Sequence, residues 1–79
     1  MTKEEIYDRL NEVFKTVFDD DSIIVHEYTS ADSIDGWDSL EHINLMVAVE
    51  NEFGIKFNMG EVTTMENVGD MVNIIMSKL

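Results

Sequence analysis

The residue best suited to covalent chemistry in this sequence is Ser39. It lies in the run DGWDSLE at residues 35–41, where a polar segment gives way to an apolar-rich helical pattern. A serine at a helix start is exposed at the positive end of the helix dipole, beside backbone N–H groups that have no intrahelical acceptor. Such a position suits a phosphate group. Because Asp38 already serves as the N-cap, the hydroxyl of Ser39 is not needed for capping.

A catalytic serine is the first alternative for Ser39. The chain has only two histidines, His26 and His42, and His42 follows Ser39 by three residues on the same predicted helix. No Gly-x-Ser-x-Gly sequence surrounds the serine, and a domain this small has little room for a substrate cleft. The absence of cysteine removes any thiolate for catalysis or zinc binding. We therefore expect no enzyme activity and no catalytic residue.

A calcium loop is the second alternative for the segment before Ser39. With Gly36 as the sixth position of an EF-hand loop, the first position is Ala31 and the twelfth is His42. Both of these positions need an acidic residue for calcium binding. The pattern fails where the ligands matter most, so we expect no defined metal site.

Composition limits the classes of partner. The chain has 79 residues and a formal charge of −12, which indicates one domain over residues 1–79 and excludes nucleic acid as a partner. The charge favours partners with basic surfaces. No signal peptide and no apolar run long enough for a membrane span are seen in the sequence. We expect a cytoplasmic monomer.

Four helices are expected, each with a start signal of its own. The first begins after Thr2, the second after Asp38, a short third after Asn58, and the last after Asn67. An acidic residue follows each cap three positions later, as in a capping box, and these residues are Glu5, Glu41, Glu61 and Asp70. The sequence therefore predicts an all-α fold: a four-helix bundle with three main helices, one short helix and a long first loop.

The ends and buried faces of these helices also follow from the sequence. The first helix is expected to end near Phe18, and the second near Phe53, before Gly54. Apolar residues at helical spacing mark the buried stripes. In the first helix the stripe is Ile6, Leu10, Val13, Phe14 and Val17, and in the last helix it is Val68, Met71, Val72, Ile75 and Leu79.

A long connection separates the first two helices, from Asp19 to Trp37. Residues 23–29 have strand-like propensity but no partner strand. We therefore expect an ordered loop that is pinned to the core by Ile23 or Ile24 and by Ile34. Connections of this length are usually functional or disordered.

The second helix has two apolar faces. Its core face is expected to carry Leu45, Val49 and Phe53, with Met46 at the edge. A second apolar patch contains Leu40, Ile43 and Val47, and Ser39 and Glu50 lie between the two faces. The second patch either packs under the long loop or the third helix, or forms an exposed docking surface rimmed by acids. Both interpretations can hold for different residues.

Three segments of this chain resemble the acyl carrier proteins. They are DSL at residues 38–40, which opens the second helix, ENEFGI at residues 50–55, which ends it, and NVGD at residues 67–70. The resemblance covers nearly the whole chain. It implies that Ser39 carries 4′-phosphopantetheine, attached from coenzyme A by a phosphopantetheinyl transferase with a divalent cation. The thiol of that arm holds acyl intermediates as thioesters.

The same resemblance implies a role for the residues around Ser39. Asp38 is expected to assist the transferase and its metal. The resemblance also places several side chains against acyl-loading and acyl-processing enzymes that have basic docking surfaces. These side chains are Leu40, Glu41, Ile43, Val47 and Glu50.

Some positions depart from the usual pattern of the family. Asn44 and Asn51 stand where fatty-acid carriers usually have acids, and Trp37 precedes the Asp-Ser pair where a small residue is usual. Residues 56–60 contain no acid. These departures favour a specialised carrier that serves a dedicated pathway, such as polyketide synthesis, lipid modification or saccharide acylation. The alternatives are a peptidyl or aminoacyl carrier domain and a small acidic helical interaction module without a prosthetic group.

Overall fold

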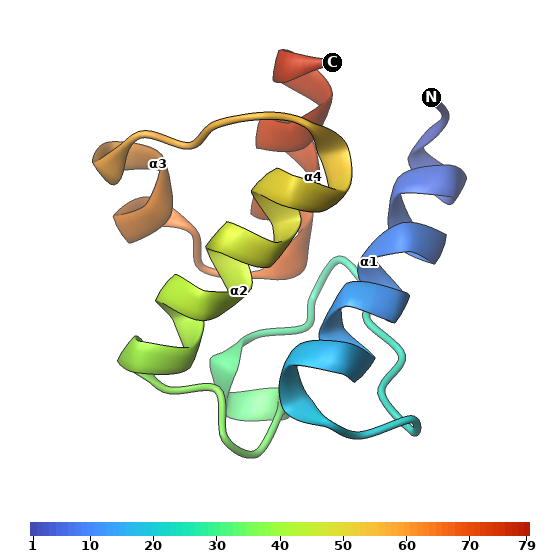
Figure 1. Ribbon diagram of the computed structural model, residues 1–79, viewed down its shortest axis with the longest axis vertical. Coiled ribbons are helices and arrows are strands. Elements are labelled where there is room, and N and C mark those ends of the chain that lie inside the picture. The colour runs from blue at the N-terminus through green and yellow to red at the C-terminus, as the bar shows by residue number, and fades with distance from the viewer.

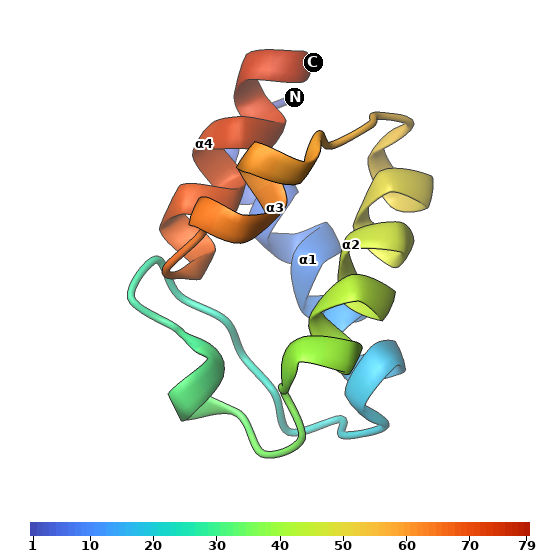
Figure 2. The same cartoon turned by 90° about the vertical axis from the view of Figure 1, so that its left-hand side faces the viewer.

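The chain folds as four helices with no strand, and the computed structural model describes all 79 residues (Figure 1). The helices are α1 (Lys3–Phe18), α2 (Ser39–Phe53), α3 (Met59–Thr64) and α4 (Val68–Lys78), and one turn of 3₁₀ helix, η1 (Ala31–Ser33), interrupts the first loop. Two views at right angles place both chain termini at one end of the bundle and the start of α2 at the other (Figures 1 and 2). The all-α bundle predicted from the sequence is confirmed.

Side-chain caps explain why the helices begin where they do. Thr2 and Glu5 form a complete capping box at the start of α1, and Asn58 and Glu61 form one at the start of α3. Each box satisfies two backbone N–H groups that would otherwise have no acceptor. The predicted caps at Asp38 and Asn67 are confirmed as well, since each side chain accepts a hydrogen bond from the backbone three residues later.

Three expectations about the helices are wrong. Asp70 does not complete a capping box at α4, because its carboxylate accepts a hydrogen bond from the backbone N–H of Glu66 (3.0 Å) and not from that of Asn67. Glu41 does not complete a capping box at α2, because its carboxylate accepts a hydrogen bond from the Asn44 side chain (3.3 Å) while the backbone N–H of Asp38 donates to the carbonyl of Gly36 (3.0 Å). Leu79 does not extend the buried stripe of α4. It lies beyond the last helical residue with 54% of its surface exposed, so the bundle ends before its side chain can pack.

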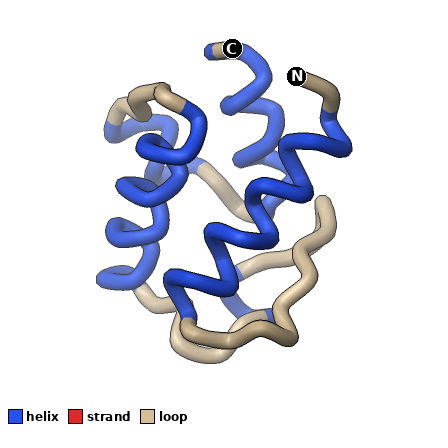
Figure 3. Tube along the Cα trace, turned by 45° about the vertical axis from the view of Figure 1, so that its right-hand side comes forward, coloured by secondary structure: helices blue, strands red, loops and turns tan.

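One core joins α1, α2, α4 and the loops. It contains 15 buried apolar residues, and the core face predicted for α2 is confirmed because Leu45, Met46, Val49 and Phe53 are all buried. α2 ends where Gly54 takes a left-handed conformation (φ 66°), which glycine adopts without strain. Loop residues Ile23, Val25 and Ile55 complete the core. The loops connect the helices at the two ends of the bundle (Figure 3).

The long first loop is ordered by contacts to two helices. Ile23 is buried while Ile24 is 66% exposed, so the loop is pinned by the first of the two candidates. The backbone of Val25 donates to the side chain of Asn11 (2.7 Å). Val25 and Thr29 are also buried, although the sequence did not single them out. The expected ordered loop is therefore confirmed, with more anchors than predicted.

The start of α4 is held by the same loop. The backbone N–H groups of Val68 and Gly69 donate to the carbonyls of Thr29 (2.8 Å) and Glu27 (2.9 Å). A Cβ atom at position 69 would meet the Glu27 oxygen at 2.9 Å, so only glycine permits this approach. The loop thus supplies the acceptors that the first N–H groups of α4 lack within the helix. These hydrogen bonds fix the start of α4 against the loop.

Candidate functional site around Ser39

Ser39 is the first residue of α2, and its side chain is exposed. Asp38 takes over the cap, because its carboxylate accepts from the backbone N–H of Glu41 at 2.8 Å. The hydroxyl of Ser39 makes no hydrogen bond within the chain. The backbone N–H groups of Ser39 and Leu40 have no acceptor either, as expected for the first turn of a helix. The site therefore presents a free hydroxyl beside two free N–H donors.

A cluster of aromatic rings holds the segment that leads into Ser39. The ring of Trp37 lies edge-on to Phe14, with centroids 5.3 Å apart, and contacts Phe18 at 6.1 Å. Phe14 is fully buried in α1. Edge-to-face aromatic pairs of this kind stabilise beyond their buried area. The first helix thus fixes the position of the residue two places before the serine.

The side chain of His42 connects three parts of the fold. Its Nδ1 accepts from the indole N–H of Trp37 (3.1 Å), and its Nε2 lies 3.0 Å from the carbonyl oxygen of Val62 on α3. This pattern fits the neutral tautomer that carries its proton on Nε2. Both ring nitrogens are therefore occupied, and His42 has no lone pair left to activate Ser39. These two contacts of His42 are a structural reason against a catalytic role for Ser39.

Removing this histidine should destabilise the fold. In His42→Ala, the indole N–H of Trp37 and the carbonyl of Val62 lose a half-buried partner, and we expect the free energy of unfolding to fall by about 1–3 kcal/mol. Urea unfolding measures this change. His26→Ala is the matched control, because that ring is exposed and stacks only on Tyr28, and it should change stability by less than about 0.5 kcal/mol. Equal losses in the two variants would contradict the bridging role of His42.

A cavity of about 490 Å³ opens beside the serine. Its walls come from the first turns of α2, from α3 and from α4, and they include Ser39, Ile43, Met59, Val62 and Met71. Seven of the 13 lining residues are hydrophobic. Methionine side chains adapt readily to ligands of different shape. The cavity therefore offers an adaptable apolar space that begins at the candidate attachment residue.

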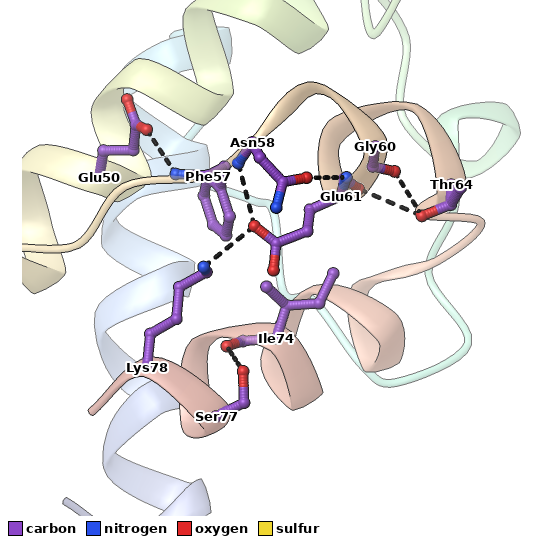
Figure 4. Close-up of polar contacts among 9 residues, drawn as sticks. All are labelled: Glu50, Phe57, Asn58, Gly60, Glu61, Thr64, Ile74, Ser77 and Lys78. Atoms are coloured by element: carbon purple, nitrogen blue, oxygen red, sulfur yellow. Dashed lines mark hydrogen bonds and ion pairs between the residues drawn. The ribbon is translucent and has the colours of Figure 1, made fainter.

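α3, which forms one wall of this cavity, is fixed by a charged contact to α4. The carboxylate of Glu61 accepts from the backbone N–H of Asn58 (3.0 Å) and pairs with the ammonium group of Lys78 (3.0 Å; Figure 4). The hydrogen bond from Asn58, followed by the contact with Lys78, lowers the pKa of the Glu61 carboxyl group below its ordinary value.

This lowered pKa gives the stability of the protein a specific pH dependence. A carboxyl group whose pKa is lower in the folded state stabilises the fold above its ordinary pKa and loses that contribution as the pH falls through the lowered value. We expect Glu61→Gln to be less stable than wild type at neutral pH, with the difference shrinking in acid. Urea unfolding across this pH range tests the expectation. Glu66→Gln is the control, because it removes the same charge at an exposed position. The stability difference between this variant and wild type should not shrink in acid in the same way.

The apolar patch predicted on α2 is exposed. Leu40 is 70% exposed, Val47 51% and Ile43 48%, so none of the three packs fully under the loop or under α3. Ile43 fits both interpretations, because it is partly exposed and also lines the cavity beside Ser39. Of the two interpretations that the sequence left open, an exposed surface describes Leu40 and Val47.

The acidic residues near this patch differ in their surroundings. Asp38 is exposed and Glu41 is half-buried, and both lie at the Ser39 end of α2. Glu50 is half-buried near the other end of α2, where its carboxylate accepts a hydrogen bond from the backbone N–H of Phe57 at 2.7 Å. Glu50 therefore holds the connection between α2 and α3, a structural role that the sequence did not reveal.

The sequence missed two parts of this site. The bridge from Trp37 through His42 to Val62 was not predicted, although Trp37 had been noted as unusual for its position. Met59, at the cavity wall and 72% exposed, was not among the candidates. No cluster of three or more His, Cys, Asp and Glu side chains is arranged to hold a metal ion, and no helix is long and apolar enough to cross a membrane.

A small helical bundle that presents a free serine hydroxyl beside an apolar cavity fits a carrier of a covalent group. Comparison with known proteins agrees. Residues 8–75 match the family described as "Phosphopantetheine attachment site". An acyl carrier protein of Petrotoga mobilis is 31% identical over 80 residues, which cover 100% of this chain and 93% of the relative. An acyl carrier protein of Thermotoga maritima is 30% identical over 79 residues, with 99% and 96% coverage.

A solved structure supports the same conclusion. The solution NMR structure of a holo acyl carrier protein from Geobacter metallireducens superposes with a TM-score of 0.85 at 47% sequence identity, over 91% of this chain and 83% of that one. The chain belongs to the acyl carrier protein family and carries acyl groups on a covalently attached phosphopantetheine. Members of this family are carriers rather than catalysts. The peptidyl-carrier and interaction-module alternatives find no such support.

Proposed function

We propose that Ser39 is the attachment point of 4′-phosphopantetheine and that the start of α2 is where partner enzymes meet the chain. The observation that carries this proposal is the state of the Ser39 hydroxyl. It is exposed and makes no hydrogen bond, although its position at a helix start would normally recruit it as a cap. Asp38 fills that role instead, so the hydroxyl remains available for a transferase.

The surroundings of Ser39 fit a phosphodiester. The free backbone N–H groups of Ser39 and Leu40 are donors for its oxygens, and the α2 dipole favours negative charge at this end. Asp38 would oppose that charge at close range, and a divalent cation supplied for the transfer reaction would relieve the repulsion. When bound, the arm supplies a thiol that this chain lacks, since the sequence has no cysteine, and that thiol holds the acyl group as a thioester.

Partner enzymes are the second part of the proposal. The phosphopantetheinyl transferase and the acyl-loading and acyl-processing enzymes contact Leu40, Ile43 and Val47, and Asp38, Glu41 and Glu50 add negative charge to that face. A formal charge of −12 attracts basic partners over long distances and speeds their encounter. The neutral side chains at Asn44 and Asn51 favour a specialised pathway.

Thiol titration tests the proposed function. Because the chain contains no cysteine, the thiol content of the purified apo protein is zero. After incubation with coenzyme A, magnesium and a promiscuous phosphopantetheinyl transferase, followed by removal of small molecules, we expect one thiol per chain. Loading with an acyl derivative of coenzyme A should mask that thiol, and hydroxylamine should release it. A thiol content that stays at zero after incubation would refute the proposal.

A further inference from the structure

The turn of α2 that carries Ser39 has no buried side chain. Leu45 is the first buried residue of this helix, and Leu40, which follows Ser39, is 70% exposed. Helix ends that lack buried contacts open more readily than the rest of a fold. The position of the Ser39 hydroxyl therefore depends on contacts other than packing in the core.

Two hydrogen bonds to Asp38 close this turn. The Asp38 carboxylate accepts from the backbone N–H of Glu41 at 2.8 Å, and the Asp38 carbonyl accepts from the backbone N–H of His42 at 2.8 Å. Both bonds lie within the start of α2 itself. They shape the turn, but they do not attach it to the rest of the protein.

Trp37 and His42 supply that attachment. Because Asp38 is the cap, Trp37 is the residue just before the cap and His42 is the fourth residue of the helix. Side chains at these two positions can pack across a helix start as a hydrophobic staple, which fixes the angle at which the chain enters the helix. Here the rings stack with centroids 6.0 Å apart, and the indole N–H donates to Nδ1 of His42 at 3.1 Å. We call Trp37 and His42 the aromatic staple.

The aromatic staple is anchored on two other helices. Trp37 lies edge-on to the fully buried Phe14 of α1, with centroids 5.3 Å apart. Nε2 of His42 lies 3.0 Å from the carbonyl oxygen of Val62 on α3. A proton on Nε2, donated to that carbonyl, leaves Nδ1 as the acceptor that the indole needs. The contact with α3 thus keeps the imidazole in the form that can bind Trp37.

We propose that Trp37 and His42 are positioning residues for attachment of the arm, because the aromatic staple holds the turn that presents the Ser39 hydroxyl. This inference rests on the proposed function, and it assigns a role to two residues that act through Ser39. Attachment requires the Ser39 oxygen to lie in line with the phosphate group that it attacks. A small misplacement of that oxygen slows the chemical step more than it weakens binding.

Substitutions at position 42 test this role, with kcat and KM for loading by a promiscuous phosphopantetheinyl transferase as the readouts. His42→Phe keeps a ring but has neither the acceptor nor the donor. We expect it to lower kcat about tenfold and to leave KM within about twofold of wild type. His42→Gln has an acceptor and a donor on its amide, and it should restore kcat to within about threefold of wild type.

Trp37→Phe tests the other half of the aromatic staple. It removes the indole donor and keeps an aromatic ring against Phe14. We expect kcat to fall about threefold. Adding Trp37→Phe to His42→Phe should lower kcat no further, because both changes break the same hydrogen bond. Additive losses would show that the two side chains act independently and would overturn the inference.

Ile75→Val is the control for a loss of stability alone. Ile75 is fully buried in the C-terminal half of α4, and the end of α4 lies at the opposite end of the bundle from the start of α2 (Figures 1 and 2). We expect this variant to be less stable than wild type but to keep kcat within about twofold. A similar loss of kcat in Ile75→Val and His42→Phe, or a His42→Gln variant no faster than His42→Phe, would overturn the inference.

Amide hydrogen exchange of the apo protein gives a readout that does not need the arm. We expect the Glu41 amide, which donates to Asp38, to exchange about tenfold faster in His42→Phe and within about twofold of wild type in Ile75→Val. If wild type gains no arm, the proposed function fails, and exchange still reports on the aromatic staple. If the Glu41 amide is equally protected in all three proteins and all three gain the arm at the same rate, only the positioning role is refuted.

Discussion

Replacing Ser39 with alanine abolishes attachment of the arm, and the Ser39→Ala chain keeps its unmodified mass after incubation with coenzyme A, magnesium and transferase. The reason is chemical, since the arm is joined through its phosphate to a side-chain oxygen that alanine lacks. The fold is expected to survive the change. Asp38 holds the cap, and the Ser39 side chain makes no hydrogen bond that alanine would lose.

Ser33→Ala is the matched control for this result. Ser33 is an exposed serine in the neighbouring 3₁₀ turn, η1, so it offers a similar hydroxyl a few residues away. We expect the Ser33→Ala protein to gain the arm at the rate of wild type. A mass gain in the Ser39→Ala protein would show that position 39 is not the attachment point. A loss of modification in both variants would show that the effect is not specific to position 39.

The largest effect on stability is expected from Phe14→Ala. Phe14 is fully buried in α1 and touches both Phe18 and Trp37. Removing a buried phenyl ring leaves a cavity that the surroundings fill only in part, at a cost of about 3–5 kcal/mol. Small domains are stable by only about 5–15 kcal/mol, so this loss removes a large share of the total. Urea unfolding followed by circular dichroism measures it.

Tyr28→Ala separates the loss of packing from the loss of an aromatic residue as such. Tyr28 is 73% exposed on the first loop and stacks on His26. We expect its removal to change the free energy of unfolding by less than about 0.5 kcal/mol. If Phe14→Ala were as stable as Tyr28→Ala, the aromatic cluster would not be what holds the segment before Ser39.

The helices were predictable because their signals are local. A cap such as Thr2 or Asn58 acts on a backbone group three residues away, so the sequence alone reveals it. Even within one helical turn, the sequence did not determine the partner of Glu41. This residue has the spacing of a capping-box partner for Asp38, yet its carboxylate accepts a hydrogen bond from the Asn44 side chain. The sequence places both possible partners three residues from Glu41.

Contacts between distant segments were not predictable. The loop anchors at Val25 and Thr29 depend on Asn11 of α1 and Val68 of α4, which only the folded chain brings together. The hydrogen bonds of His42 likewise reach Val62, 20 residues away. A pattern of apolar residues at helical spacing predicts which face is buried, but it carries no information about such polar pairings.

In the candidate site, too, local features were predictable and contacts between distant segments were not. The free hydroxyl of Ser39 was predictable from the sequence, because Asp38 directly precedes it as a better-placed cap. The exposed face of α2 followed from helical spacing as one of two interpretations. The engagement of Glu50 with Phe57 and the place of Met59 beside the cavity required the fold, since both depend on how α3 packs against α2.

Fragmentation of the loaded protein tests the central claim most directly. After incubation with coenzyme A, magnesium and transferase, the protein is digested and the modified peptide is sequenced by tandem mass spectrometry. We expect the full mass of the arm on Ser39 and on no other residue, with every other serine and threonine of the chain unmodified. An arm found on a different side chain, or a fully loaded protein whose Ser39 peptide is unmodified, would contradict the account.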